Sequence, residues 1–368
     1  MYIKSISFEI KSDEINWEID NLEFNKINLI SGKNASGKTR VLSSIITLIY
    51  LMRGGSDIGV EGFSWSIKLI ENKIEYIYDL KIKNQLILHE ELKIDNKVYF
   101  SRNEEGKGKI KYETKKGLNL DFEIEKNKII LAFRRDKIQH PSLEVIFNCI
   151  NSLYKFNFGD TLGKYTSYTI KNGQNNNDTD VVYKFKKGVE KFGDKFKEKI
   201  IQEFNALDYN ISDIFLKEIV DNSLVLVIKE NTNDIEQQFI SQGMFRALSL
   251  IIQITYLEFR KNEQTIVLID DIGEGLDFER ANNLIKYLIK NAEGQKERLQ
   301  LIMTTNDRLV MNNVPLDYWI IVDKDEKGKI NFYSQKTHPK NFENFEDIGL
   351  NNFDFFSGEY YKNCVWGD

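Results

Sequence analysis

Apolar and polar residues alternate along much of the first third of the chain, and this pattern predicts β-strands. Between residues 63 and 112, apolar side chains occupy every second position, and turn-forming pairs such as Glu71-Asn72 and Asp95-Asn96 interrupt them. Alternation divided in this way by turn residues is typical of an antiparallel meander. We therefore expect an antiparallel β-subdomain in this part of the chain.

The second half of the chain combines helical periodicity with short apolar runs. Residues 242–261 and 278–291 carry apolar side chains three and four positions apart, and the apolar runs 265–269 and 299–304 follow them. Strands that are buried on both faces have continuous apolar runs, and helices between them cover the sheet. The pattern predicts a mostly parallel sheet with helices packed against it.

The middle of the chain has a mixed pattern. Residues 127–133 predict one more strand and residues 142–154 a helix. Residues 159–180 are rich in Asn, Gly, Thr and Lys, which favours a loop, whereas residues 184–209 carry charges at helical spacing. No heptad repeat continues through this stretch, so a long coiled coil is not expected. We interpret residues 151–238 as a compact, partly mobile lid.

Composition indicates a globular protein and excludes a membrane span. The chain has 368 residues, 41% of them hydrophobic, yet no apolar run approaches the ~20 residues that cross a bilayer. Charged residues near the N-terminus also argue against a signal peptide. Cys149 and Cys364 match no metal-ligand spacing, so we expect no zinc site and a reducing, cytoplasmic setting. The net charge of −5 means that contact with DNA would need a local basic face or a groove between subunits.

A glycine-rich loop follows the apolar run 26–31. Its sequence, Gly32-Lys33-Asn34-Ala35-Ser36-Gly37-Lys38-Thr39, has the spacing glycine, four residues, Gly-Lys-Ser/Thr, and a helical pattern follows it. Glycines there let backbone N–H groups turn toward phosphates at a helix N-terminus. Lys38 would contact the β- and γ-phosphates of ATP, and the Thr39 hydroxyl would ligate Mg²⁺. We assign nucleotide binding to Gly32, Asn34, Ala35, Ser36, Gly37, Lys38, Thr39 and the adjoining Arg40.

Two carboxylates follow the apolar run 265–269. Asp270 and Asp271 would lie at the carboxyl edge of a parallel sheet, where such folds bind ligands. Asp270 suits a Mg²⁺ ligand, direct or through water. Asp271 stands where a general base would orient an attacking water. The alternative interpretation is an acidic strand end that caps the following turn.

The order of these motifs resembles the ABC ATPase superfamily, in particular its soluble branch of SMC, RecF-like and OLD-type ATPases. The eight residues from Asp270 to Asp277 are similar to that family's Walker B strand and D-loop. Residues 239–244 occupy the place of the ABC signature as a degenerate match, in which Ser241 can cap a helix and Gly243 permits close approach. The resemblance implies that this helix start binds the γ-phosphate held by a second subunit. A plain helix cap at Ser241 is the alternative.

Two positions depart from the pattern of that family. Asp271 replaces the usual glutamate and is one methylene shorter, and Asn306 replaces the switch histidine. An asparagine can hydrogen-bond a phosphate or a water but cannot accept a proton at neutral pH. We therefore expect a catalytic set of Lys38, Asp271 and Asn306 with slow turnover, which suits a timer or clamp.

Two further features have competing interpretations. Gln139, in a polar turn, is our candidate for a Mg²⁺-sensing glutamine that couples to the lid, and a surface turn explains it equally well. Asp323 and Asp325 are spaced like the paired aspartates of TOPRIM nucleases, but strands on both sides favour a hairpin turn. A nuclease, if there is one, is expected on another polypeptide.

The expected fold is α/β, an ABC/SMC-head-type P-loop NTPase with a mostly parallel core sheet, an antiparallel β-subdomain and a helical lid insertion. We divide the chain into a P-loop lobe with the meander (1–150), the lid (151–238), the signature and Walker B lobe (239–340) and an aromatic C-terminal tail (341–368). The tail is expected to dock on its own core or on a partner.

The resemblance implies ATP and Mg²⁺ as cofactors and a homodimer closed through composite ATP sites, with higher oligomers left open. Our first hypothesis is a nucleotide-gated sensor or assembly subunit of a bacterial antiphage system with a separate effector protein, because small stand-alone ATPases of this branch often belong to two-gene systems. A RecF-like DNA-repair ATPase is the second hypothesis and makes nucleic acid a candidate partner. A non-hydrolysing ATP-bound scaffold is the third. No membrane partner is expected, since the degenerate signature, the β-subdomain and the lid disfavour a transporter subunit.

Overall fold

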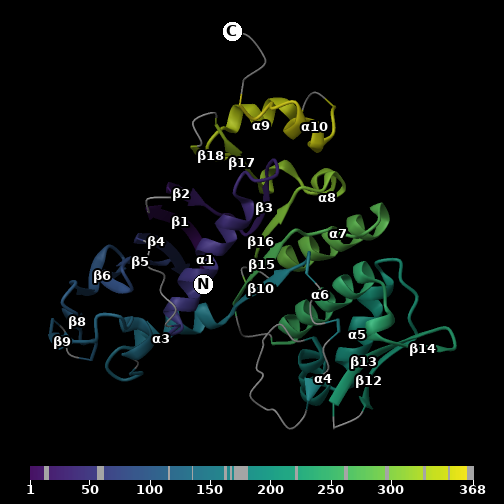
Figure 1. The fold of residues 1–368 in the computed structure, drawn as a ribbon, viewed down its shortest axis with the longest axis horizontal. Coiled ribbons are helices and arrows are strands. Elements are labelled where there is room, and N and C mark those ends of the chain that lie inside the picture. The colour runs from purple at the N-terminus through teal and green to yellow at the C-terminus, as the bar shows by residue number, and fades with distance from the viewer. Residues whose placement is uncertain are drawn as a thin grey trace.

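Three β-sheets organise the chain, and helices fill the spaces around them (Figure 1). The outer antiparallel sheet and the lid lie on opposite sides of the core sheet, and the C-terminal helices cover one end of the molecule. The computed structural model describes residues 1–11, 16–55, 62–114, 117–134, 136–160, 164–165, 168–169, 181–219, 223–260, 264–294, 298–325, 329–346 and 349–362.

The core sheet has six strands in the order β10-β15-β16-β3-β17-β18. They are β10 (Leu153–Asn157), β15 (Thr265–Asp270), β16 (Leu299–Thr305), β3 (Ile27–Ser31), β17 (Trp319–Lys324) and β18 (Ile330–Ser334). The first five are parallel, and β18 pairs antiparallel with β17. The predicted mostly parallel sheet is therefore confirmed, as is the hairpin predicted around Asp323. Every residue of β3, β15 and β16 is buried, which explains their unbroken apolar runs.

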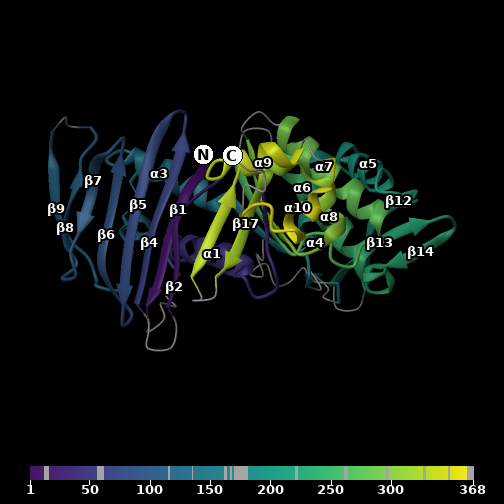
Figure 2. The ribbon, with the colours of Figure 1, turned by 90° about the horizontal axis from the view of Figure 1, so that it is seen from above.

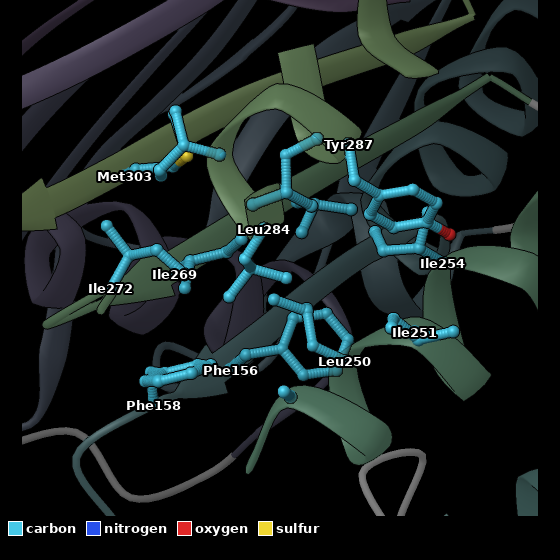
Figure 3. Close-up of a cluster of buried hydrophobic side chains, with 14 of the residues drawn as sticks. Phe156, Phe158, Leu250, Ile251, Ile254, Ile269, Ile272, Leu284, Tyr287 and Met303 are labelled. Atoms are coloured by element: carbon cyan, nitrogen blue, oxygen red, sulfur yellow. The ribbon is translucent and has the colours of Figure 1, made fainter. Parts of the chain in front are cut away.

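Alternate side chains of the core strands enter two separate hydrophobic cores. Ile269 and Met303 lie on one face and pack with α6 and α7, as Figure 3 shows. Leu268 and Ile302 belong to the other core, together with α1 and the outer sheet. The period of two along each strand divides the apolar side chains between the two cores. The helices concerned are α1 (Lys38–Met52), α6 (Gln242–Phe259) and α7 (Phe278–Gly294).

The outer sheet is antiparallel throughout and has the order β2-β1-β4-β5-β6-β7-β8-β9. Figure 2 shows its strands side by side at one end of the molecule. The predicted meander supplies most of the sheet, and the two N-terminal strands extend it. Its strands are β1 (Tyr2–Lys11), β2 (Asn16–Glu23), β4 (Gly62–Glu71), β5 (Ile74–Lys83), β6 (Leu86–Ile94), β7 (Lys97–Arg102), β8 (Lys107–Lys111) and β9 (Asn119–Glu123).

The strand predicted at residues 127–133 is wrong, because this run contains the short helix α2 (Ile130–Phe133). Both carboxylate oxygens of Glu90 accept the backbone N–H of Ile130 at 3.0 Å. The first N–H groups of a helix have no partner within the helix, and this buried carboxylate supplies one. Periodicity cannot distinguish a short buried helix from a short buried strand. The next helix, α3 (Pro141–Asn151), ends before residue 154 because the chain then enters the core sheet as β10.

The described part of the lid consists of two helices that pack against α6 and a small antiparallel sheet that packs against those helices. The first residues of the expected insertion instead form β10, the edge strand of the core sheet. Most of the loop expected at residues 159–180 lies outside the described residues. The helices are α4 (Val181–Phe192) and α5 (Asp194–Asn205), and the strands are β11 (Tyr168–Thr169), β12 (Asp213–Ile219), β13 (Ser223–Glu230) and β14 (Asn233–Glu236). A 3-10 helix (Gln237–Phe239) leads from the lid into α6.

The aromatic tail packs on the protein's own core. Phe342, Phe355 and Tyr361 are almost fully buried and join the core formed with α6 and α7. Trp366 lies outside the described residues. In the described part of the chain, no helix has both the length and the apolar character needed to cross a bilayer. The remaining helices are α8 (Arg308–Asn313), a 3-10 helix (Leu316–Tyr318), α9 (Pro339–Glu346) and α10 (Asn352–Ser357).

Candidate functional site

The phosphate loop, residues 32–39, joins the carboxyl end of β3 to the start of α1. A Cβ at Gly32 would lie 2.5 Å from Ser36 Oγ and from the Val322 carbonyl oxygen, so only glycine fits there. Gly37, the N-cap of α1, has φ 110°, and Ala35 has φ 62°. These left-handed residues curl the loop around the helix N-terminus, where backbone N–H groups favour an anion.

Lys38 points into the loop. Its Nζ donates hydrogen bonds to the carbonyl oxygens of Gly32 (2.8 Å) and Lys33 (3.2 Å), and only 8% of the residue is exposed. Burial lowers the pKa of the Lys38 ammonium, while the charges of Asp271 and Asp270 act in the opposite direction. A buried ammonium at the N-terminus of a helix is suited to binding the phosphates of a nucleotide.

Asp270 and Thr39 come together at the carboxyl edge of the core sheet. Thr39 Oγ1 lies 3.4 Å from Asp270 Oδ1, and the Thr304 hydroxyl donates to the same carboxylate oxygen. Asp270 is only 7% exposed. A hydroxyl and a carboxylate are oxygen ligands of the kind that Mg²⁺ prefers.

Asp271 leaves the strand in a left-handed conformation, with φ 54°. Its backbone N–H donates to Thr304 Oγ1 at 3.0 Å. Burial raises the pKa of the Asp271 carboxyl, as do the charges of Asp270 and Glu274, and Lys38 opposes them. A carboxylate with a raised pKa has increased proton affinity, which suits a general base.

Asn306 lies beside the phosphate loop. It follows β16, the strand next to β3, and its Nδ2 donates to Asn34 Oδ1 at 3.0 Å. The amide expected to contact phosphate or water is therefore next to the loop expected to hold the phosphates.

Two buried oxygen atoms at this edge indicate that the site fits a ligand. Ser36 Oγ and Asn157 Oδ1 have no hydrogen-bond partner among the described residues, whereas most buried polar atoms are paired. Ser36 is part of the phosphate loop, and Asn157 lies opposite Asp270 in the β10–β15 register. The Ser36 hydroxyl is therefore placed to bind a phosphate, and Asn157 Oδ1 is placed to bind a hydrated cation.

A metal ion held by protein side chains alone is a poorer fit. The described residues contain no group of three or more His, Cys, Asp or Glu side chains placed to hold a metal. Mg²⁺ bound with a nucleotide needs only one or two protein carboxylates, because phosphates and water supply the other ligands.

The structure does not bring Gln139 to this site. Its backbone N–H donates to Asp136 Oδ1, and its carbonyl accepts from the backbone of Glu113 beside the outer sheet. Gln139 lies just before α3, and the ring of the neighbouring His140 contacts the Lys111 carbonyl and the Tyr99 ring, so this turn packs against the outer sheet. Asn157, at the carboxyl end of β10, lies opposite Asp270 in the strand register.

Ser241 and Gly243 lie at the start of α6. Ser241 is the exposed N-cap of this helix, and its Oγ accepts the backbone N–H of Met244 at 3.3 Å. A Cβ at Gly243 would lie 2.3 Å from the Gly275 carbonyl oxygen, so this glycine allows the loop 271–277 to touch α6. These two contacts join the helix start to its own backbone and to the loop 271–277.

The Arg40 side chain extends toward Trp17 of the outer sheet, whose indole nitrogen would lie 3.5 Å from a Cβ at Gly37 of the phosphate loop. The Arg40 guanidinium carbon lies 6.0 Å from the centroid of the Trp17 ring. The two residues line an aromatic cavity of about 200 Å³ together with Phe8, Phe63 and Trp65.

Sequence reasoning missed Thr304 and Asn157, and it also missed Arg246, whose guanidinium donates to the carbonyls of Gly159 and Glu274 beside the site. Thr304 and Asn157 are polar residues at the carboxyl ends of apolar strands, which is the signal that identified Asp270. Asn157 was hidden because residues 153 and 154 were assigned to a helix. Arg246 lies within a helix, and no local pattern marks it.

Comparison with known proteins supports the fold. The sequence matches no protein-family model and no curated protein. An SMC head bound to the C-winged helix domain of ScpA has a similar structure, with a TM-score of 0.57, 13% identity, and coverage of 92% of this chain and 100% of that chain. Two further SMC heads match less well. The SMC head domain from Thermotoga maritima has a TM-score of 0.46 and 15% identity, and the match covers 91% of this chain and 99% of that chain. The ScpA-bound head from Pyrococcus furiosus has a TM-score of 0.49 and 12% identity, and the match covers 94% of this chain and 99% of that chain. The chain therefore has the P-loop α/β fold of an SMC head domain.

Proposed function

We propose that this protein binds ATP with Mg²⁺ and hydrolyses it slowly, as an SMC-like ATPase that closes as a head-to-tail homodimer around the nucleotide. The observation that carries the proposal is the convergence of Lys38, Thr39 and Asp270 at one edge of the core sheet. A buried ammonium, a hydroxyl and a carboxylate at the start of one helix form the set that an ATP–Mg²⁺ complex requires.

The residues of the site divide the chemical work. Lys38 exchanges its bonds to loop carbonyls for bonds to phosphate oxygens, and Thr39 and Asp270 hold Mg²⁺. The ion neutralises charge on the phosphates when it is bound. Asp271, whose pKa burial and neighbouring carboxylates raise, accepts a proton from the attacking water. Asn306 orients the water or the phosphate through its amide.

Slow turnover is supported by the two side chains nearest the expected water. Asp271 is one methylene shorter than glutamate, and the Asn306 amide cannot take up a proton.

We expect slow single-turnover hydrolysis in the wild type and a rate about tenfold higher in Asp271→Glu, because the longer side chain brings the base closer to the water. Rapid quench of a single turnover measures both rates. A wild-type rate typical of transporter ATPases contradicts slow turnover, and no hydrolysis in either protein supports the scaffold alternative.

Dimer formation is supported by the exposed start of α6. Ser241 is the exposed N-cap of a helix of 18 residues. A helix N-terminus of this kind attracts an anion, here the γ-phosphate held by the second subunit.

A role as a sensor or assembly subunit in antiphage defence, with a separate effector, extends this proposal. Its support is the combination of a nucleotide site with a head that lacks a coiled coil among its described residues. The similar SMC head is itself bound to a domain of another protein. Co-purification with the product of the neighbouring gene, with and without ATP, tests the role, and the absence of a complex in both conditions contradicts it.

A second candidate, an ATPase that clamps DNA, is favoured by one local feature. Helix α4 carries four lysines and one glutamate, and Lys187 and Lys191 are exposed. Lys184 is buried and Lys186 is paired with Glu190. Lys187 and Lys191 are therefore the lysines of this helix placed to contact phosphate backbones. ATP-dependent binding to duplex DNA that weakens steeply with salt supports this candidate, and salt-independent or absent binding contradicts it.

A further inference from the structure

Arg246 joins three segments of the site through one guanidinium group. It lies in α6, five residues after Ser241, and only 8% of it is exposed. Its Nη1 donates to the Glu274 carbonyl oxygen at 2.9 Å, its Nε donates to the Asp160 carbonyl oxygen at 3.2 Å, and its Nη2 donates to the Gly159 carbonyl oxygen. The start of α6 is thereby bonded to both the loop 157–160 and the loop 271–277.

Both loops are bonded to the strand end at Asp270. Asn157 lies opposite Asp270 in the β10–β15 register, and the Phe158 N–H donates to the Asp270 carbonyl at 2.9 Å. On the other side, Asp271 follows directly and its carbonyl accepts the Glu274 N–H at 3.3 Å. A displacement of Asp270, the proposed Mg²⁺ ligand, would therefore move both loops, because each is bonded to this strand end.

Two further contacts connect the start of α6 to the same loops. Gln242 Nε2 donates to the Asp160 carbonyl at 3.1 Å. Gly243 touches Gly275 closely enough to exclude a Cβ. The helix start and the two loops are thus packed and hydrogen-bonded as one unit, with Arg246 at its centre.

We propose that Arg246 is a positioning residue that couples nucleotide binding at the phosphate loop to the presentation of the Ser241 helix start to a second subunit. The inference rests on the proposed ATP-dependent dimer. The guanidinium is a rigid, planar group with five N–H donors, so it can bond carbonyls of two loops at once and fix their relative positions. Arg246 itself contacts neither the phosphate loop nor Asp270, so its effect is on closure and not on the first binding of ATP.

The test compares Arg246→Lys with Arg260→Lys on the same helix. Lysine keeps the charge but has a single nitrogen, so it cannot span the three carbonyls. Arg260 lies at the far end of α6, where its Nη1 donates to the Tyr154 hydroxyl at 2.9 Å, and serves as the matched control. The measurements are ATP affinity at low protein concentration, with a fluorescent ATP analogue, and ATP-dependent dimerisation by analytical ultracentrifugation.

We expect Arg246→Lys to retain ATP affinity within about threefold and to weaken ATP-dependent dimerisation at least about tenfold, because charge-assisted bonds between the helix and the loops are lost. Arg260→Lys should match the wild type in both measurements. Unchanged dimerisation of Arg246→Lys overturns the inference, and so does an equal loss of ATP affinity and dimerisation, which indicates only structural support. A wild-type protein that binds no ATP or forms no dimer overturns the proposed function and the inference with it.

Hydrogen exchange on the wild type provides a measurement that needs no variant. We expect residues 157–160 and 271–277 to gain protection together when ATP and Mg²⁺ are added to the protein. Protection of only one of these loops overturns the inference, even if Arg246→Lys does not fold.

Discussion

A single threonine hydroxyl connects the two aspartates at the carboxyl end of β15. Thr304 Oγ1 donates to the Asp270 carboxylate and accepts the backbone N–H of Asp271. One carboxylate is held toward Thr39, and the left-handed backbone at Asp271 turns the second one out of the strand. Two adjacent aspartates of identical chemistry are thereby given different surroundings, which suits one to a metal and the other to a proton.

The two lysines of the phosphate loop provide a matched pair for testing ATP binding. Lys38 is buried in the loop, whereas Lys33 points outward to an ion pair with Glu359. We expect Lys38→Ala to abolish ATP binding and Lys33→Ala to change the affinity by less than about fivefold, since exposed ion pairs contribute little. Equilibrium titration with a fluorescent ATP analogue measures both. Equal affinities in the two variants would contradict the assigned role of Lys38.

At the scale of elements, the connection between the outer sheet and the core depends on a buried charged pair. Glu90 of β6 is fully buried and accepts hydrogen bonds from the Tyr78 hydroxyl and the Ile130 N–H at the start of α2. Arg102 of β7 lies 3.5 Å from the same carboxylate and donates to the carbonyls of Glu125 and Lys126. This cluster fixes α2 where the apolar pattern alone predicts a strand.

Glu90→Ala tests the importance of that cluster. The change leaves Arg102, the Tyr78 hydroxyl and a helix N–H without their buried partner, so we expect a loss of about 3 kcal/mol or more in unfolding free energy. Glu91→Ala on the same strand removes an ion pair with Lys93 and should cost under about 1 kcal/mol. Urea denaturation followed by circular dichroism measures the difference. Similar midpoints for the two variants would show that Glu90 is dispensable.

At the scale of the whole molecule, the core sheet separates two hydrophobic cores and collects the site at one edge. The phosphate loop, Asp270, Asn157 and Asn306 all follow carboxyl ends of parallel strands, which is where open α/β sheets bind ligands. Ser241, at the start of α6, is exposed, and its side chain caps its own helix. A second copy of the chain would bring the two parts of the site together.

Removing the proposed base should make the dimer persist. In Asp271→Ala, ATP can still contact Lys38, Thr39 and Asp270, but no carboxylate takes the proton from water. We therefore expect ATP and Mg²⁺ to convert the variant from monomer to dimer, with a lifetime well beyond that of the wild type. Mass measurement by light scattering after gel filtration checks this, with Lys38→Ala as the monomeric control. A monomeric Asp271→Ala protein in saturating ATP would contradict the composite site.

The sequence by itself determined the features that depend on neighbours along the chain. The spacing of Gly32, Gly37 and Lys38 predicts a phosphate loop, because a backbone that curls around an anion needs glycine at fixed positions. Continuous apolar runs predict the buried parallel strands, and alternation predicts the meander, because side-chain periodicity reports how many faces of a strand are buried.

Only the tertiary structure decided which distant segments meet. Glu90 makes residues 130–133 helical, β10 places Asn157 instead of Gln139 beside Asp270, and Arg246 joins two loops through backbone carbonyls. Backbone carbonyls and N–H groups are present at nearly every position, so partners of this kind leave no signal in the sequence. Local spacing therefore specifies the site's chemistry, and the packing of the core sheet specifies its geometry.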